Sequence, residues 1–204
     1  MTFAQSTKEA QDLKQQSLKK SKKKKSFKRS LVEWFVVIII AFVGALLIRT
    51  FVFQTYYIPS SSMEPTLDIG DRILVDKLAF DLGSIQRGDI VVFYKPPSVK
   101  QFPNGTVFVK RVIGLPGETI YSNKYGTIFI NGKPIADPWL KDSPSGPGIQ
   151  IRYQKIPKGY YFVMGDNRGD SEDSRYFGPI ARSSIIGKVD MVFWRHGHPE
   201  IDIL

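Results

Sequence analysis

Three consecutive serines, Ser60 to Ser62, lie between two prolines in the stretch YYIPSSSMEPTL. Such a polar run is usually loop, but a serine hydroxyl is also a nucleophile when a base within hydrogen-bond reach can take its proton. The sequence therefore raises two questions: whether one of the three hydroxyls does chemistry, and which residue is its base.

Histidine is the usual partner of a nucleophilic serine, and this chain has only His196 and His198. Both lie in RHGHPE, which we expect to be a polar tail after the last strand, where histidine is more often solvated than catalytic. They could bind a metal weakly, but no cluster of carboxylates accompanies them. The sequence has no cysteine, which excludes a disulfide framework, a thiolate zinc site and a cysteine nucleophile.

A lysine can replace histidine as the base if it is buried, because desolvation lowers the pKa of an ammonium group. Lys110 in TVFVKRVIGLPG is the candidate. Because side chains alternate along a strand, Phe108, Lys110 and Val112 should share one face. Val109 and Arg111 should lie on the other. The alternative is an edge strand on which Lys110 points to water, the common fate of lysine.

The stretch VMGDNRGDSEDSRYFG, which follows an apolar run, is dense in charged and polar residues. Its carboxylates, among them Asp166 and Asp170, alternate with Arg168 and Arg175, which predicts internal ion pairs. The spacing does not fit the calcium-binding EF-hand pattern. A loop that braces an active site and an ordinary solvated loop both remain open interpretations.

The segment LVEWFVVIIIAFVGALLIRTFVF, residues 31–53, predicts a membrane-spanning helix. As a helix its 23 residues would extend about 35 Å, enough for a hydrocarbon core of about 30 Å. Trp34 at one end and Phe51, Phe53, Tyr56 and Tyr57 at the other resemble interfacial aromatic belts. A buried soluble helix would leave the apolar surface all round it unexplained. A cleavable signal peptide is a further alternative, but no small-x-small cleavage site follows the apolar run.

Residues 1–30 hold ten lysines and arginines against two acidic residues, so that this tail carries +8 of the net charge of +10. The remaining +2 gives no basis for nucleic-acid binding outside the tail. The positive-inside rule places the tail in the cytoplasm and the residues after about 54 on the far side. We expect the lysine cluster to contact anionic lipid.

From residue 68 onward, runs rich in Val, Ile, Phe and Tyr alternate with turn residues. The expected strands lie in RILVDKLAF, DIVVFYK, TVFVKRVIG, GTIFINGKPI, YYFVMGD and KVDMVFWR. The Asn-Gly pair in IFINGKPI predicts a hairpin with a type I′ turn. The expected fold class is mainly β: an antiparallel β catalytic domain over 54–204, with a small variable β insertion at about 122–152, preceded by the N-terminal transmembrane helix.

Three blocks in this order, PSSSMEPT, VKRVIGLPG and GDNRGDSEDSR, resemble the type I signal peptidases, the membrane-bound serine proteases that remove leader peptides from exported proteins. RGDIVVF, residues 87–93, matches a fourth block of that family and the spanning segment a fifth, so that the likeness covers about 31–195. Each block is a moderate signal alone, but the set in this order is specific. The single anchor and short insertion resemble the shorter bacterial form.

The resemblance implies that Ser62 is the nucleophile and Lys110 the general base of a Ser-Lys dyad. It implies that the Ser60 hydroxyl and the Ser62 backbone N–H form the oxyanion hole, and that Ser171 hydrogen-bonds Lys110 and orients it. Two supporting ion pairs are implied, Asp173 with Arg175 and Asp166 with Arg111. Residues that match the family's shallow apolar pockets for small residues at −1 and −3 are Ile58, Pro59, Met63, Leu67, Phe108 and Val109.

The implied activity is cleavage of signal peptides from exported preproteins, with no metal or other cofactor. The implied partners are preproteins and the lipid bilayer, with the export translocon nearby and no nucleic acid. The implied location is the bacterial plasma (inner) membrane, single-pass, with a thylakoid membrane as the alternative. The nine residues from Phe53 to Ser62 span at most about 30 Å when extended, so that Ser62 would work near the membrane surface.

Two other functions compete with this interpretation. Self-cleaving repressors of the DNA-damage response also use a Ser-Lys dyad, but they are soluble and carry an N-terminal DNA-binding domain, for which residues 1–30 are too short. An anchored β domain that binds exported chains without cutting them is the second alternative. The presence of Ser62, Lys110 and Ser171 argues against that second alternative.

Overall fold

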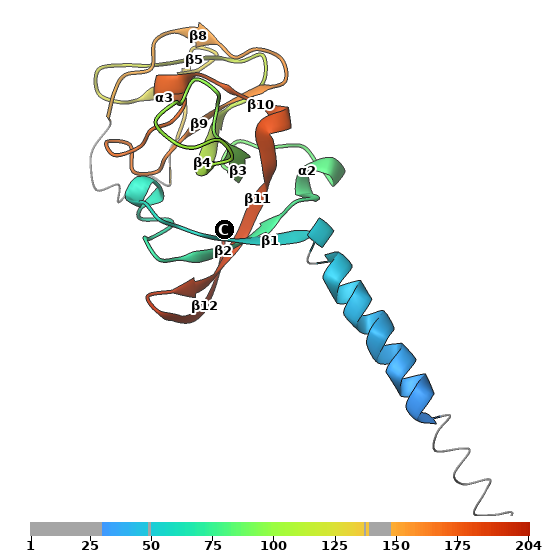
Figure 1. Ribbon diagram of the computed structural model, residues 1–204. Helices are drawn as coiled ribbons and strands as arrows, with labels where there is room; N and C mark the ends of the chain where they lie inside the picture. Colours follow the sequence, from blue (N-terminus) through green and yellow to red (C-terminus); the bar gives the residue numbers. More distant parts are fainter. Residues whose placement is uncertain (1–29, 49, 137, 139–147) are drawn as a thin grey trace, which may run out of the picture. The chain divides into compact units, whose positions relative to one another are not determined.

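The computed structural model describes residues 30–48, 50–136, 138 and 148–204 (Figure 1). Its contacts divide the chain into two units, residues 1–49 and 50–204. The basic tail up to residue 29 lies outside the described residues, as does most of the Pro/Gly/Ser-rich part of the expected insertion. The two units are therefore considered one at a time.

The described part of the first unit is one helix, Ser30–Ile48, which is long and apolar enough to cross a membrane by length and composition. Its 19 residues correspond to about 28 Å of helix. None of its most apolar stretch is buried. The expected span of 31–53 is too long, because Phe53 already belongs to the first strand.

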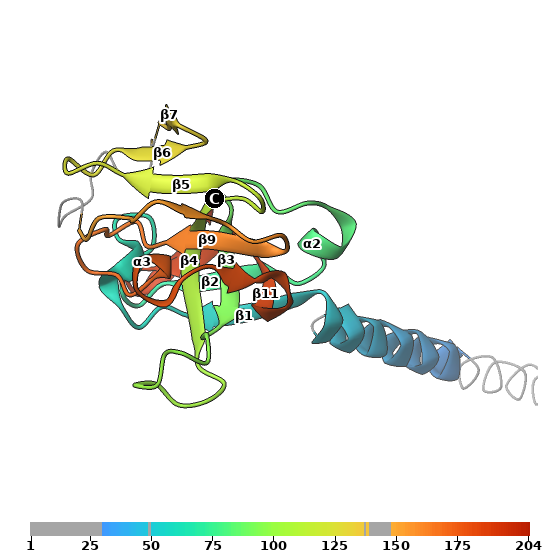
Figure 2. The same cartoon turned by 90° about the horizontal axis from the view of Figure 1, so that it is seen from above.

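The second unit is built on an eight-stranded antiparallel sheet in the order β1-β2-β11-β3-β4-β9-β10, with β12 paired to β11 (Figures 1 and 2). Its strands are β1 (Phe53–Tyr57), β2 (Arg72–Asp76), β3 (Ile90–Tyr94), β4 (Val107–Gly114), β9 (Tyr160–Met164), β10 (Ile180–Ala181), β11 (Ile185–Arg195) and β12 (His198–Ile203). The short helices are η1 (Ser61–Met63), α2 (Ala79–Leu82), α3 (Ser174–Phe177) and η3 (Arg182–Ser184). This architecture confirms the expected fold class.

A second sheet, in the order β7-β6-β5-β8, comes from one continuous stretch between β4 and β9 and lies beside β9 in Figure 2. Its strands are β5 (Thr119–Ser122), β6 (Ile128–Ile130), β7 (Lys133–Pro134) and β8 (Gln154–Lys155). Asn131 and Gly132 both have positive φ, 51° and 78°, which confirms the type I′ hairpin. The β insertion is thus wider than 122–152 at both ends.

The alternation expected along β4 is confirmed by its packing. Val109 packs against one buried cluster, which contains Ile58, whereas Phe108 and Val112 belong to another. Lys110 lies between Val109 and Arg111 on a strand that pairs with β3 on one side and β9 on the other. Because the Lys110 side chain is buried, the alternative of a lysine that points to water is excluded.

The expectation for the two histidines was wrong in one respect. His196 and Gly197 form a tight turn, with φ of 51° and 84°, and His198 begins β12, which pairs with β11. The sequence concealed this edge strand because its alternate side chains, including Pro199, face solvent. His196 Nε2 lies 3.4 Å from a carboxylate oxygen of Asp68, and both histidines are exposed.

Candidate active site

The three serines lie in a segment that is fixed at both ends. Ile58 N–H donates to the carbonyl of Asp71 at 2.9 Å, and Gly70 N–H donates to the carbonyl of Ile58 at 2.9 Å. Ser60 has an extended backbone, and η1 starts at the next residue. Met63 at the end of η1 is 1% exposed and anchors the turn in the core. The serine run is therefore an ordered turn and not a linker.

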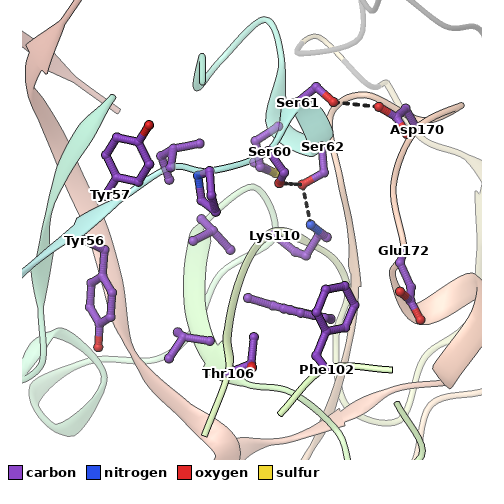
Figure 3. Close-up of a pocket in the computed structure, with 16 residues that line it drawn as sticks. Tyr56, Tyr57, Ser60, Ser61, Ser62, Phe102, Thr106, Lys110, Asp170 and Glu172 are labelled. Atoms are coloured by element: carbon purple, nitrogen blue, oxygen red, sulfur yellow. Dashed lines mark hydrogen bonds between the residues drawn. The ribbon is translucent and has the colours of Figure 1, made fainter. Parts of the chain in front are cut away.

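Lys110 reaches the last of the three hydroxyls. Its Nζ lies 2.7 Å from Ser62 Oγ, and the lysine is only 5% exposed. An ammonium would donate to the hydroxyl at this distance, and a neutral amine would accept from it. Ser60 Oγ lies 3.4 Å from Ser62 Oγ on the other side (Figure 3). The structure thus brings together Ser60, Ser62 and Lys110.

Burial lowers the pKa of Lys110 from its usual 10.5 to about 8, and this desolvation is the largest cause of the shift. Three carboxylates oppose it by raising the pKa, those of Asp173, Asp166 and Glu172. The Arg175 guanidinium lowers the pKa further. With a pKa of about 8, roughly one Lys110 in ten is neutral at pH 7 and about half are neutral at pH 8, and the neutral amine is the form that can act as a general base.

The ion pair expected between Asp173 and Arg175 is present, with 2.8 Å between the carboxylate and Nη2. Asp173 also caps α3 by accepting the Arg175 N–H, and it accepts the Gly165 N–H and the Ser171 hydroxyl at 3.0 and 2.8 Å. The Ser171 hydroxyl therefore bonds Asp173, and not Lys110 as the resemblance implied. The Ser171 hydroxyl hydrogen is directed at an ionised carboxylate, which is a strong acceptor.

Arg111 and Asp166 also form the expected pair, 2.6 Å apart, with the aspartate fully buried. The Thr66 hydroxyl donates to Asp166 at 2.6 Å, and Arg111 Nη1 donates to the carbonyl of Gly88 at 2.8 Å. This network connects the strand of the lysine to the segment that follows the serines. The role of Thr66 was missed, although it belongs to the block PSSSMEPT.

The loop between β9 and α3, residues 165–173, holds the serine turn from the other side. Asn167 N–H donates to the carbonyl of Ser62 and Asn167 Nδ2 to the carbonyl of Ser61, each at 3.2 Å. The Ser61 hydroxyl donates to Asp170 at 2.6 Å. Asn167 and Asp170 were not assigned roles from the sequence, where these contacts join residues more than 100 positions apart. The only sequence feature that pointed to them was their position in the polar stretch VMGDNRGDSEDSRYFG.

A cleft of about 340 Å³ opens onto the serines and Lys110 (Figure 3). Five of the six residues expected in an apolar substrate wall line it: Ile58, Pro59, Met63, Phe108 and Val109. Leu67 does not line it, because its side chain is fully buried in the core. The lining residues that were not anticipated are Tyr56, Tyr57, Ser61, Phe102, Thr106, Val107, Asp170 and Glu172.

The polar loop has no geometry for a metal. Within the described ranges, no group of three or more His, Cys, Asp or Glu side chains is arranged to hold an ion. Asp166 and Asp173 are instead engaged with arginines. Because Asp166, Asn167 and Asp173 are buried, the interpretation of this loop as a brace for the site is favoured over an ordinary solvated loop.

An antiparallel β domain with a serine and a buried lysine in an apolar cleft is compatible with a peptidase, and comparison with known proteins agrees. A family model described as "Signal peptidase, peptidase S26" matches residues 31–194. The chain belongs to this signal peptidase family, whose members are peptidases and therefore hydrolases.

Named relatives cover most of the chain. A signal peptidase I from Leptolyngbya laminosa is 42% identical over 80% of this chain and 80% of that protein. A signal peptidase I from Bacillus amyloliquefaciens is 44% identical over 86% of this chain and 90% of that protein. A crystal structure of a signal peptidase I from Enterococcus faecalis is 35% identical, covers 52% of this chain and 97% of that chain, and aligns with a TM-score of 0.44.

Proposed function

We propose that this protein is a membrane-bound serine endopeptidase that removes signal peptides from exported preproteins, with Ser62 as nucleophile and Lys110 as general base. The observation that carries the proposal is the 2.7 Å contact between Ser62 Oγ and Lys110 Nζ. It is supported by the burial that lowers the pKa of this lysine to about 8. The two histidines lie at the β11–β12 turn and do not line the cleft.

The reaction follows from these positions. Neutral Lys110 takes the proton of Ser62 as Oγ attacks the scissile carbonyl carbon, and the carbonyl oxygen becomes an oxyanion. The Ser60 hydroxyl and the Ser62 N–H stabilise that oxyanion. When the C–N bond breaks, the Lys110 ammonium gives its proton to the leaving amine. Neutral Lys110 then activates a water, which hydrolyses the ester and releases Ser62.

The proposal includes a preference for small residues at −1 and −3 of the signal peptide, as the family resemblance implies. Ile58, Phe108 and Val109 line the cleft beside the serines with apolar surface, which suits the apolar side chains of a signal peptide. The pairs Asp173–Arg175 and Asp166–Arg111 are proposed to hold the β9–α3 loop and β4 in position. Ser171 is proposed to act indirectly: its hydroxyl bonds Asp173, and the Asp173 carboxylate raises the pKa of Lys110.

We further propose that the helix Ser30–Ile48 is an uncleaved membrane anchor. Residues 1–30 would then lie in the cytoplasm and the peptidase domain on the extracytoplasmic side of the membrane. The basic tail supports this orientation through the positive-inside rule. The partners would be preproteins and the bilayer, near the export translocon and without nucleic acid. The plasma (inner) membrane is the proposed location and a thylakoid membrane the alternative.

The decisive experiment incubates the detergent-solubilised protein with a purified preprotein and follows the products on a gel. Wild type should shorten the preprotein, whereas Ser62→Ala and Lys110→Ala should not. The rate should rise with pH and level off above about pH 8, because Lys110 must be neutral. A chelator should leave the rate unchanged. Cleavage by Lys110→Ala would refute the dyad, and binding without cleavage by wild type would favour a chain-binding module.

A further inference from the structure

Asn167 holds both carbonyls of the peptide units that flank the Ser62 Cα. Its side-chain Nδ2 donates to the carbonyl of Ser61 and its backbone N–H to the carbonyl of Ser62, each at 3.2 Å. Asn167 is 4% exposed, so that its amide is shielded from competing water. The side chain of a loop residue thus sets the orientation of a turn more than 100 positions earlier.

The carbonyl of Ser61 matters because it belongs to the same peptide unit as the Ser62 N–H. That unit is planar and trans, so its C=O and N–H point in opposite directions. Fixing the oxygen therefore fixes where the N–H points. The same oxygen also accepts the Glu64 N–H at 3.0 Å, and the two donors occupy both lone pairs of the carbonyl. A flip of this peptide would break both bonds and turn an oxygen toward the cleft.

We infer that Asn167 is a positioning residue for the oxyanion hole: its side-chain amide holds the Ser61–Ser62 peptide so that the Ser62 N–H faces the developing oxyanion. This inference rests on the proposed role of Ser62. The role requires a side-chain donor, because an aspartate at the same site presents an acceptor to the carbonyl oxygen and repels it. An alanine leaves Glu64 N–H as the one remaining donor.

The test compares two matched peptide inhibitors, one ending in an aldehyde and one in the corresponding alcohol. With the aldehyde, Ser62 Oγ bonds the carbonyl carbon, its proton passes to Lys110, and the oxygen becomes an oxyanion. The alcohol fills the cleft but forms no oxyanion. Asn167→Asp and Asn167→Ala should weaken aldehyde binding about 10-fold or more and leave alcohol binding unchanged. With substrate, kcat should fall by a similar factor while KM changes little.

Asn123→Ala is the matched control, because Asn123 also supports a turn through its side chain, accepting the N–H groups of Tyr125 and Thr127 at 2.9 and 3.0 Å. It lies in the turn between β5 and β6 and does not line the cleft. It should lower Tm without changing the ratio of aldehyde to alcohol affinity. Asn167→Gln, which keeps an amide on a longer side chain, should recover part of the aldehyde affinity.

Three outcomes would overturn the inference: equal loss of aldehyde and alcohol affinity, loss of Tm with an unchanged affinity ratio, or full activity in Asn167→Asp. If Asn167→Ala does not fold, the isosteric Asn167→Asp carries the test. If the wild-type protein binds the aldehyde no more tightly than the alcohol, the proposed role of Ser62 as nucleophile is refuted. This result distinguishes failure of the proposed function from failure of the inference on Asn167.

Discussion

At the scale of single residues, the candidate site depends on a lysine whose side chain is shielded from solvent. Lys110 is 5% exposed on an interior strand, and its pKa falls to about 8 because the charged form is desolvated. The burial that would suit Lys110 to its proposed role as a base also lowers the stability of the fold, since the unfolded chain can solvate the ammonium. Catalytic competence and stability are therefore opposed at this position.

Replacement of Lys110 by methionine should stabilise the protein at neutral pH. Between about pH 8 and 10.5 the unfolded chain binds more protons at this residue than the folded one, so the free energy of unfolding of wild type rises with pH there. At pH 7 the lysine opposes folding by roughly 3 kcal/mol. Lys110→Met should raise Tm at pH 7, with a gain that shrinks toward pH 10.5. Lys133→Met, at an exposed site in β7, is the control, and an equal gain at both pH values would contradict the argument.

The Glu172 carboxylate should influence the pKa of Lys110. Its carboxylate lines the cleft and raises the pKa of Lys110, so that Glu172→Gln should lower that pKa. The midpoint of the pH–rate profile should then move to lower pH, with more activity at pH 7 and an unchanged plateau. Asp170→Asn is the matched control, because Asp170 lines the same cleft but is not one of the carboxylates that raise this pKa. Equal shifts in both variants would refute a specific role.

Residue roles differed in how far the sequence could predict them. Ser62 and Lys110 could be proposed because each lies in a short block with a recognisable pattern, and Lys110 has apolar neighbours in alternation. Asn167 could not, because its partners are brought close only by the pairing of distant strands. Leu67 was misassigned because an apolar residue near a cleft can face either the cleft or the core, and its sequence neighbours do not decide which.

At the scale of elements, the interior strands of the large sheet could be predicted, whereas β1 and β12 could not. β3 and β4 lie inside the sheet and read as apolar runs. β1 was interpreted as a membrane belt, since aromatic residues serve both purposes, and β12 was hidden by its solvent-facing residues. In the sequence, one residue reflects the close approach of β9 to the serine turn: Gly165, directly after the strand, where a side chain would not fit.

Gly165→Ala should abolish most activity. A Cβ at this position would overlap the carbonyl oxygen of Ser62 and the hydroxyl of Ser171, and the first of these is backbone that has no other rotamer. The turn that carries Ser62 would have to move away from Lys110, so that kcat should fall by about 100-fold, the usual cost of a misplacement near 1 Å. Gly44→Ala in the apolar helix, where the new methyl meets nothing, is the control. Wild-type kcat in Gly165→Ala would contradict this packing.

At the scale of the whole molecule, the chemistry and the membrane segment reside in different units. Every described residue that lines the cleft belongs to residues 50–204, and the apolar helix belongs to the other unit. Net charge follows a similar division, with +8 in residues 1–30 and +2 in the remainder. Sequence composition alone predicted this division, because membrane insertion depends on bulk hydrophobicity and charge and needs no long-range contact.

Removal of residues 1–49 should therefore leave peptide cleavage intact but remove the attachment of the catalytic domain to the membrane. The remaining chain keeps β1, whose five residues pair with β2 along their whole length, so the sheet and cleft should form. It should cleave a short detergent-dissolved peptide at close to the rate of the full chain. It should cut a preprotein embedded in lipid vesicles much more slowly, because the anchor no longer confines Ser62 to the surface where the cleavage site emerges.

A chimera in which a plain leucine-alanine helix of equal length replaces Ser30–Ile48 should restore cleavage in vesicles, since an apolar span of about 30 Å is enough to anchor the domain. Vesicle flotation followed by gel analysis measures both binding and cleavage for the three proteins. If the chimera binds vesicles but cuts slowly, the native helix does more than anchor, and its own side chains would have to take part in substrate recognition. If the truncated chain cuts vesicle-bound preprotein as fast as the full chain, confinement at the membrane contributes nothing.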